Sequence, residues 1–160
     1  MPSHLPVTKE IKDLLTDLLG REVTVSPDKP FAPGPKAPGS VAVYVDDALR
    51  VTALIACDLS LSAYAGAAIG LIPVTATEEA IEGAALSETL SENLYEVLNI
   101  AASLFNAPGA EHLRLYDMHP AGGELPAAVR VQTLTLGRRE DLAVDIAGYG
   151  SGRLSVVLVA

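Results

Sequence analysis

Residues 88–105, with the sequence ETLSENLYEVLNIAASLF, carry a strong helical pattern. At about 100° per residue, the polar positions fall within a sector of about 80°, and the apolar positions cluster on the opposite side. The polar positions are Glu88, Glu92, Glu96, Asn99 and Ser103, and the apolar ones are Leu90, Leu94, Val97, Leu98, Ala101 and Phe105. The pattern predicts an amphipathic helix that packs one face on a core and presents carboxylates and an amide to solvent.

The sequence before this helix predicts a second helical segment in line with it. Thr75 and Glu78 have the spacing of a capping box, which begins a helical stretch that reaches Phe105. The whole span is longer than a usual helix, so we expect a break near residues 83–87.

Two more helices are expected earlier in the chain. Thr8 is expected to cap the first helix, whose apolar residues recur at helical spacing up to Gly20, where the helix should stop. A further helix is expected at about residues 60–69.

The remaining apolar runs predict strands. They are residues 23–25, 41–45, 51–57, 112–116, 128–136, 142–146 and 154–159. The runs at 41–45 and 51–57 predict a hairpin, and residues 27–39 predict a loop rich in Pro and Gly. The order helix, strand, hairpin recurs after Asn93, which predicts an α+β fold in which a largely antiparallel sheet packs with long helices.

The length and composition restrict the class of protein. A chain of 160 residues fits a single domain over residues 1–160. The net charge of −9 argues against binding to nucleic acid or to an anionic membrane. No apolar stretch is long enough to span a bilayer, and a lone Cys57 excludes an internal disulfide, so we expect a cytoplasmic protein.

Other candidate sites have simpler structural interpretations. The histidines, His4, His112 and His119, lack the partner spacing of a zinc site, so we expect no metal. The glycines at 148, 150 and 152 lie between two expected strands, which favours a hairpin turn over a phosphate loop. Asp46 and Asp47 are interpreted as a polar turn, and Cys57 as a small core residue.

On periodicity alone, the polar face of residues 88–105 is explained by exposure, because a surface helix places Glu and Asn toward water. Glu96 and Asn99, separated by Val97 and Leu98, also resemble the Glu-x-x-Asn signature of the CheX, CheC and FliY chemotaxis phosphatases. The order of the surrounding elements resembles that family as well. The resemblance implies a CheX-like domain with a Glu96 and Asn99 catalytic pair.

The same resemblance implies a reaction and a partner. Members of the family hydrolyse the aspartyl phosphate of a CheY-like response regulator, so Asn99 would orient the attacking water and Glu96 would contact the regulator. An amide suits this role because it adds no negative charge beside a phosphoryl group. No cofactor of the chain's own is implied, since the Mg²⁺ is supplied by the partner response regulator.

The sequence departs from the family pattern near this pair. Glu92 stands where the family has Asp or Ser, and Ala102 or Ser103 replaces a glycine. We expect Glu92 and Ser103 to contact the partner.

A second copy of the motif, as in CheC relatives, is not expected. The first helix offers only Glu10 and Asp13, and an Asp in place of Asn would bring a carboxylate against phosphate. The sequence therefore predicts a single site. The resemblance leaves open a homodimer that joins sheets or a monomer.

Two other functions are left open. The domain could be a non-catalytic binding module that docks a receiver domain or assembles through a sheet edge. It could also be a small-molecule sensor with the loop at residues 27–39 as a lid.

Overall fold

One six-stranded sheet runs through the molecule, with the strand order β1-β5-β6-β3-β2-β4 and antiparallel pairing throughout. The computed structural model describes residues 2–159. The strands are β1 (Val23–Pro27), β2 (Gly39–Val45), β3 (Val51–Asp58), β4 (Arg114–His119), β5 (Arg139–Ile146) and β6 (Gly150–Leu158). The prediction of an α+β fold with a largely antiparallel sheet is confirmed.

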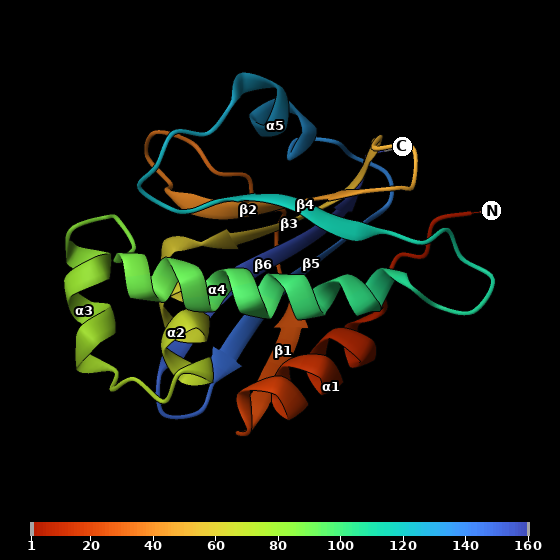
Figure 1. Cartoon of the computed structure of the whole chain (residues 1–160). Helices are drawn as coiled ribbons and strands as arrows, with labels where there is room; N and C mark the ends of the chain where they lie inside the picture. The colour runs from red at the N-terminus through yellow and green to blue at the C-terminus, as the bar shows by residue number, and fades with distance from the viewer. Residues whose placement is uncertain (1, 160) are drawn as a thin grey trace.

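Helices cover the two faces of this sheet unequally (Figure 1). The helices are α1 (Thr8–Leu19), α2 (Leu59–Ile69), α3 (Thr75–Glu82), α4 (Glu88–Ile100), a 3-10 turn η1 (Ala101–Phe105) and α5 (Ala127–Gln132). The helices α1, α2 and α4 lie on one face, and α5 lies on the other. Within residues 2–159, the helices are too short or too polar to cross a bilayer.

The expected repeat is present in the topology. The order helix, strand, hairpin occurs once as α1, β1, β2–β3 and again as α4, β4, β5–β6. If β1, β2 and β3 exchange places with β4, β5 and β6, the strand order of the sheet is the same read from its other edge. The single strand of each half pairs with the hairpin of the other half, because β1 lies beside β5 and β4 lies beside β2.

Alternation along the central strands divides the core into two layers. In β2, Tyr44 joins the large cluster under the helices, and its neighbour Val43 joins a smaller cluster on the opposite face. Successive side chains of a strand point to opposite faces, so a strand covered on both sides is apolar throughout. This explains why residues 41–45 and 51–57 read as continuous apolar runs.

The loop at residues 27–39 is anchored to the second face of the sheet. Phe31 is buried in the smaller cluster, its N–H donates to Ser155 Oγ at 3.0 Å, and the Arg153 guanidinium lies 5.5 Å from its ring centroid. The expected loop is therefore present, and its centre is fixed by an aromatic side chain.

Several other expectations hold. The break at residues 83–87 separates α3 from α4, and the helix expected at about 60–69 is α2. Residues 147–149 connect the β5–β6 hairpin, and Gly148 has a φ of 84°.

The expected strand at residues 128–136 is wrong. This segment forms the short helix α5 and a following turn instead. The carbonyl oxygens of Thr133 and Thr135 accept hydrogen bonds from the Arg139 side chain, so they are not available to a sheet ladder. Apolar content alone produced the strand prediction.

Two expected helix caps are also wrong. Helix α1 is capped at Val7, whose N–H donates to the Glu10 carboxylate at 3.1 Å, and Thr8 donates instead to Glu140. The N-cap residue of α3 is Val74, so Thr75 does not form a capping box.

The strand expected at 112–116 begins two residues later, at Arg114.

Candidate functional site

Helix α4 begins and packs for reasons that the sequence makes plain. The Ser87 side chain accepts a hydrogen bond from the Leu90 N–H at 3.2 Å, which satisfies one of the free donors of the first turn. The predicted apolar face is buried, with Leu90, Leu94, Val97 and Leu98 in the core. The opposite face of α4 is therefore directed to solvent.

Two polar contacts fix α4 on its neighbours. The Asn93 side-chain amide donates to the carbonyl oxygen of Gly66 in α2 at 2.9 Å. The Tyr44 hydroxyl on β2 donates to the carbonyl oxygen of Leu98 at 2.6 Å. A Cβ at position 66 would lie 2.6 Å from the Leu90 carbonyl oxygen, so the close approach of α2 and α4 requires glycine there.

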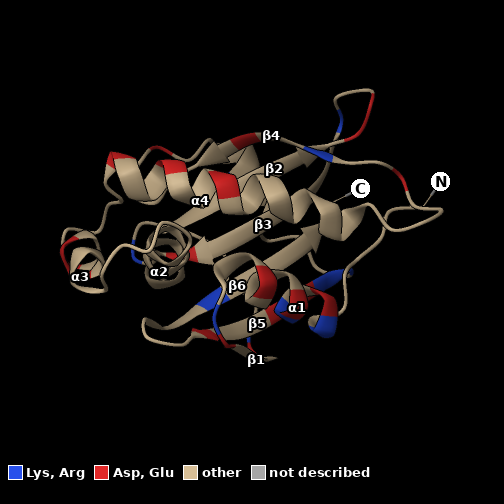
Figure 2. Cartoon of the chain, turned by 60° about the horizontal axis from the view of Figure 1, so that its bottom comes forward, with Lys and Arg blue, Asp and Glu red and all other residues tan. Residues whose placement is uncertain are grey.

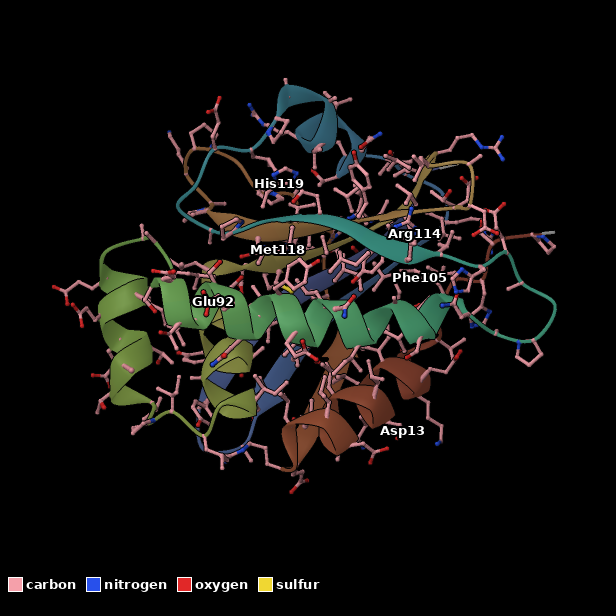
Figure 3. All side chains as sticks on the ribbon, viewed as in Figure 1. Asp13, Glu92, Phe105, Arg114, Met118 and His119 are labelled. Carbon is pink, nitrogen blue, oxygen red and sulfur yellow. The ribbon has the colours of Figure 1, made fainter. Side chains whose placement is uncertain are left out.

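The side chains predicted to carry the chemistry are exposed together. Glu92, Glu96 and Asn99 lie on the solvent side of α4, and Ser103 lies exposed in η1. Figure 3 shows Glu92 on the outward side of the α4 ribbon. Within residues 2–159, none of the four side chains forms an ion pair or hydrogen bond, so all remain available to a partner. Residues three and four apart share one helix face, which brings Glu92, Glu96 and Asn99 together.

Two apolar side chains flank this polar row, and the sequence analysis did not single them out. Tyr95 is 43% exposed and Ile100 is 37% exposed. At about 100° per residue, both fall outside the buried sector of α4, which is the signal that identifies them. The site therefore combines acidic, amide and apolar groups on one helix.

Helices α3 and α4 carry acidic residues and no basic ones. The sequence has no Lys or Arg between Arg50 and Arg114, and this interval includes Glu78, Glu79 and Glu82 of α3 in addition to the α4 glutamates. In Figure 2 the ribbons of α3 and α4 carry acidic residues and no basic ones. Opposite charge on a partner would favour its approach to this side.

The corresponding positions on α1 are engaged within the chain. The Glu10 carboxylate caps the Val7 N–H and lies 3.1 Å from His4 Nε2. Asp13 accepts a 2.6 Å hydrogen bond from Lys9 Nζ. Asp13 sits on the outer side of α1 in Figure 3, so α1 presents a paired carboxylate where α4 presents a free amide.

Other candidate residues have structural roles. Among residues 2–159, no group of three or more His, Cys, Asp and Glu side chains is placed to hold a metal ion. Cys57 is buried, and burial raises the pKa of its thiol far above the usual value, which keeps it protonated.

Asp46 shapes the β2–β3 turn. Its Oδ1 accepts the N–H groups of Ala48 and Arg50, and its Oδ2 accepts Arg50 Nε at 2.9 Å. The hydrogen bond from the Arg50 N–H is the main cause that lowers the pKa of Asp46. The turn interpretation of Asp46 is thereby confirmed.

This arrangement limits what chemistry the α4 face can perform. A carboxylate and an amide can contact a partner and orient a water molecule. The exposed groups of this face, on Glu92, Glu96, Asn99 and Ser103, are carboxylates, an amide and a hydroxyl.

Comparisons with known proteins identify the fold. No protein-family model matches the sequence, and no curated protein does. Solved structures match over nearly the whole chain. The FliM middle domain from Vibrio alginolyticus is 14% identical, covering 93% of this chain and 86% of that chain, with a TM-score of 0.56.

Two further solved structures share the architecture. A chain of the CheX–CheY–BeF3–Mg²⁺ complex from Borrelia burgdorferi is 14% identical, covering 92% of each chain with a TM-score of 0.52. FliY from Thermotoga maritima is 14% identical, covering 93% of this chain and 82% of that chain, with a TM-score of 0.52. The chain therefore has the fold seen in the FliM middle domain, in FliY and in a chain of the CheX–CheY complex.

Proposed function

We propose that the protein is a phosphatase for a phosphorylated CheY-like response regulator, with Asn99 and Glu96 as its working residues. The observation that carries the proposal is the free, solvent-exposed Asn99 amide on a helix held from both sides, beside an equally exposed Glu96. The fold supports it, because one structure of this fold is a CheX–CheY complex with BeF3 and Mg²⁺.

Asn99 supplies the chemistry in this proposal. Phosphoryl transfer requires little covalent work from the protein, so positioning of the attacking water contributes a large part of the rate. The Asn99 amide accepts a hydrogen bond from the water and donates one toward the phosphoryl oxygens. Its rigid support in α4 keeps the water in line with the bond that breaks.

Glu96 and its neighbours bind the partner. The Glu96 carboxylate pairs with a basic side chain of the regulator, and Glu92 and Ser103 contact the same surface. Mg²⁺ is bound by the regulator, and this chain supplies no ligand to it. The acidic character of α3 and α4 favours encounter with a basic receiver surface.

The experiment measures the lifetime of phosphorylated receiver domains from the same genome. Each is phosphorylated with acetyl phosphate, the donor is removed, and phosphate release is followed with and without this protein. We expect wild type to shorten the lifetime of a cognate receiver, and Asn99→Ala to lower the maximal rate on the order of 100-fold.

The variants separate chemistry from binding. Glu96→Gln should raise the half-saturating receiver concentration more than it lowers the maximal rate, and added salt should have a similar effect. Gln132→Ala is the matched control, since it removes an amide from the opposite face of the sheet. If no receiver of the genome decays faster with wild type, the proposal fails.

A second candidate is a non-catalytic binding module, favoured by the FliM middle domain having the same fold. Such a module would bind the receiver through α4 without changing the lifetime of its phosphate. Measuring binding and decay on the same samples distinguishes the two functions.

A further inference from the structure

Residues 131–136, in the segment that follows β4, are folded with their large apolar side chains outward. Val131 is 66% exposed, Leu134 58% and Leu136 77%, whereas the polar Thr133 among them is fully buried. Burial of a large apolar side chain is favourable by about 1.5–3 kcal/mol, so this inversion opposes the usual driving force. An exposed cluster of this kind marks an interaction surface.

The inversion is held in place by a buried arginine. Arg139, whose side chain is 7% exposed, donates from Nη1 to the carbonyl oxygens of Thr133 and Thr135 at 3.1 and 2.7 Å, and its Nε bonds the Asp141 carboxylate. The Thr133 hydroxyl donates to the Arg130 carbonyl oxygen. These contacts orient the turn so that Leu134 and Leu136 point away from the sheet.

A hollow lies beside this segment. It has a volume of about 320 Å³ and lies between the loop at residues 27–39 and residues 122–125. Proline, glycine and Leu125 line most of it, and Arg130 is its charged lining residue. The hollow gives a partner side chain a place to insert beside Arg130.

Two segments of this face carry basic residues and no acidic ones. Residues 29–45 and 125–139 contain no Asp or Glu, although the chain has 20 acidic residues and 11 basic ones. These two segments lie together on the second face of the sheet, where Phe31 packs in one cluster with Leu125 and Val129. Among residues 2–159, Arg130 and Arg138 form no ion pair with a carboxylate, and Arg138 donates one hydrogen bond, from Nη2 to the Ser3 carbonyl oxygen at 3.1 Å.

We propose that Val131, Leu134 and Leu136, with Arg130 and Arg138, form a docking site for an acidic, apolar segment of another protein. We call these five residues the α5 patch. Apolar side chains of the partner would cover the leucines, and its carboxylates would pair with the two arginines. If the patches of two copies of this chain paired with each other, their arginines would come together without a carboxylate. This repulsion disfavours a second copy as the partner.

The α5 patch and the α4 site lie on opposite faces of the sheet (Figure 1). Both can therefore be occupied at the same time. The inference does not depend on catalysis at Asn99.

The test uses a display library of random 12-residue peptides, selected on the full-length protein and counter-selected on the Leu134→Asp/Leu136→Asp variant. We expect enriched peptides that combine Asp or Glu with Leu, Ile or Phe. The affinity of one synthetic peptide, measured by fluorescence anisotropy, should fall at least about tenfold in Leu136→Asp and Arg130→Glu, and should fall with salt.

Leu71→Asp is the matched control. Leu71 is 78% exposed, a fraction similar to the 77% of Leu136, and it lies in the α2–α3 connection. Its substitution should leave peptide binding unchanged, and circular dichroism should show that every variant is folded.

Three results of the peptide experiments, and one of a sedimentation experiment, would overturn the proposal. One is no enrichment over the counter-selection, another is a set of peptides without acidic residues, and the third is binding that Leu136→Asp leaves intact. Sedimentation of wild type that shows self-association, abolished by Leu134→Asp/Leu136→Asp, would assign the patch to a second copy and would also overturn it.

Discussion

The hydroxyl of Tyr44 donates a 2.6 Å hydrogen bond to the carbonyl oxygen of Leu98, the residue that precedes Asn99. Tyr44 is fully buried, and its ring lies against that of Phe105 with centroids 5.0 Å apart. Burial raises the pKa of the Tyr44 hydroxyl well above its usual value, so the group stays protonated and remains a donor. A central strand thus holds the helix at the position of the candidate catalytic amide.

Tyr44→Phe should reveal this support. The substitution removes the donor from a buried carbonyl, which costs about 1–3 kcal/mol in the free energy of unfolding. Urea denaturation measures that loss, and faster amide hydrogen exchange over residues 99–105 would locate it at the helix end. Tyr116→Phe, at a residue 59% exposed, should change stability by less than about 0.5 kcal/mol. Equal effects of the two changes would contradict the assignment.

Gly66→Ala should separate α2 from α4. The added Cβ would lie 2.6 Å from the Leu90 carbonyl oxygen, a backbone atom that cannot move aside without shifting the helix. Overpacking of this kind costs about 1–3 kcal/mol. Gly34→Ala is a suitable comparison, since the nearest neighbour of its new Cβ would be 4.0 Å away. A thermal midpoint for Gly66→Ala that matches wild type would show that the contact tolerates a methyl group.

Ala84→Gly should stabilise the protein. Ala84 has a φ of 55° at the end of α3, a left-handed conformation that costs a residue with a Cβ about 1–2 kcal/mol. Glycine removes this cost but adds about 0.4–1 kcal/mol of freedom in the unfolded chain. The net gain should be about 0.5 kcal/mol, seen as a higher urea midpoint. Ala76→Gly, within α3, should lower the midpoint instead.

The sequence anticipated those elements whose pattern is set by burial. Residues 88–105 carry both an apolar and a polar face, so the helix and the exposure of Glu96 and Asn99 followed from helical spacing alone. The strands at 41–45 and 51–57 were also recognised by their apolar runs. In each case the local pattern and the tertiary packing agree.

The sequence could not anticipate elements that are set by single side-chain contacts. Residues 128–136 are apolar enough for a strand, but Arg139 binds the carbonyl oxygens of Thr133 and Thr135 and turns the leucines outward. Glu10 replaced Thr8 as the capping group of α1 because Glu140 takes the threonine hydroxyl. Single side-chain contacts of this kind leave no periodic signal in the sequence.

Asp58→Asn should change how stability depends on pH. Desolvation is the main cause that raises the pKa of Asp58, which caps α2 by accepting the Leu61 N–H. Because the folded-state pKa of Asp58 is raised, its protonated carboxyl contributes fully to stability below the unfolded-state pKa of about 3.9. This contribution is lost as the pH rises through the folded-state pKa. The Asn variant keeps the cap without the charge. It should therefore gain stability over wild type between pH 4 and pH 8, measured by urea denaturation. If the stability advantage of Asp58→Asn over wild type shrank as the pH rose, the assigned direction of the pKa shift would be wrong.

Asp13→Asn should not create a second site on α1. The change restores a Glu-x-x-Asn sequence, but the Glu10 carboxylate is already occupied by the Val7 N–H and His4. In the receiver-decay assay, Asp13→Asn combined with Asn99→Ala should behave as Asn99→Ala alone. Recovery of activity in the double variant would show that α1 can serve in the same role.

The crossing of single strands between the two halves of the sheet has a consequence for how the domain can be divided. A break in the α3–α4 connection would leave each fragment with an edge strand whose only neighbour belongs to the other fragment. Neither fragment could complete a sheet alone, yet the two together hold every partner they need. The domain is thus suited to splitting into complementary pieces that regain structure only when mixed, and its architecture is that of two interlocked protomers joined into one polypeptide.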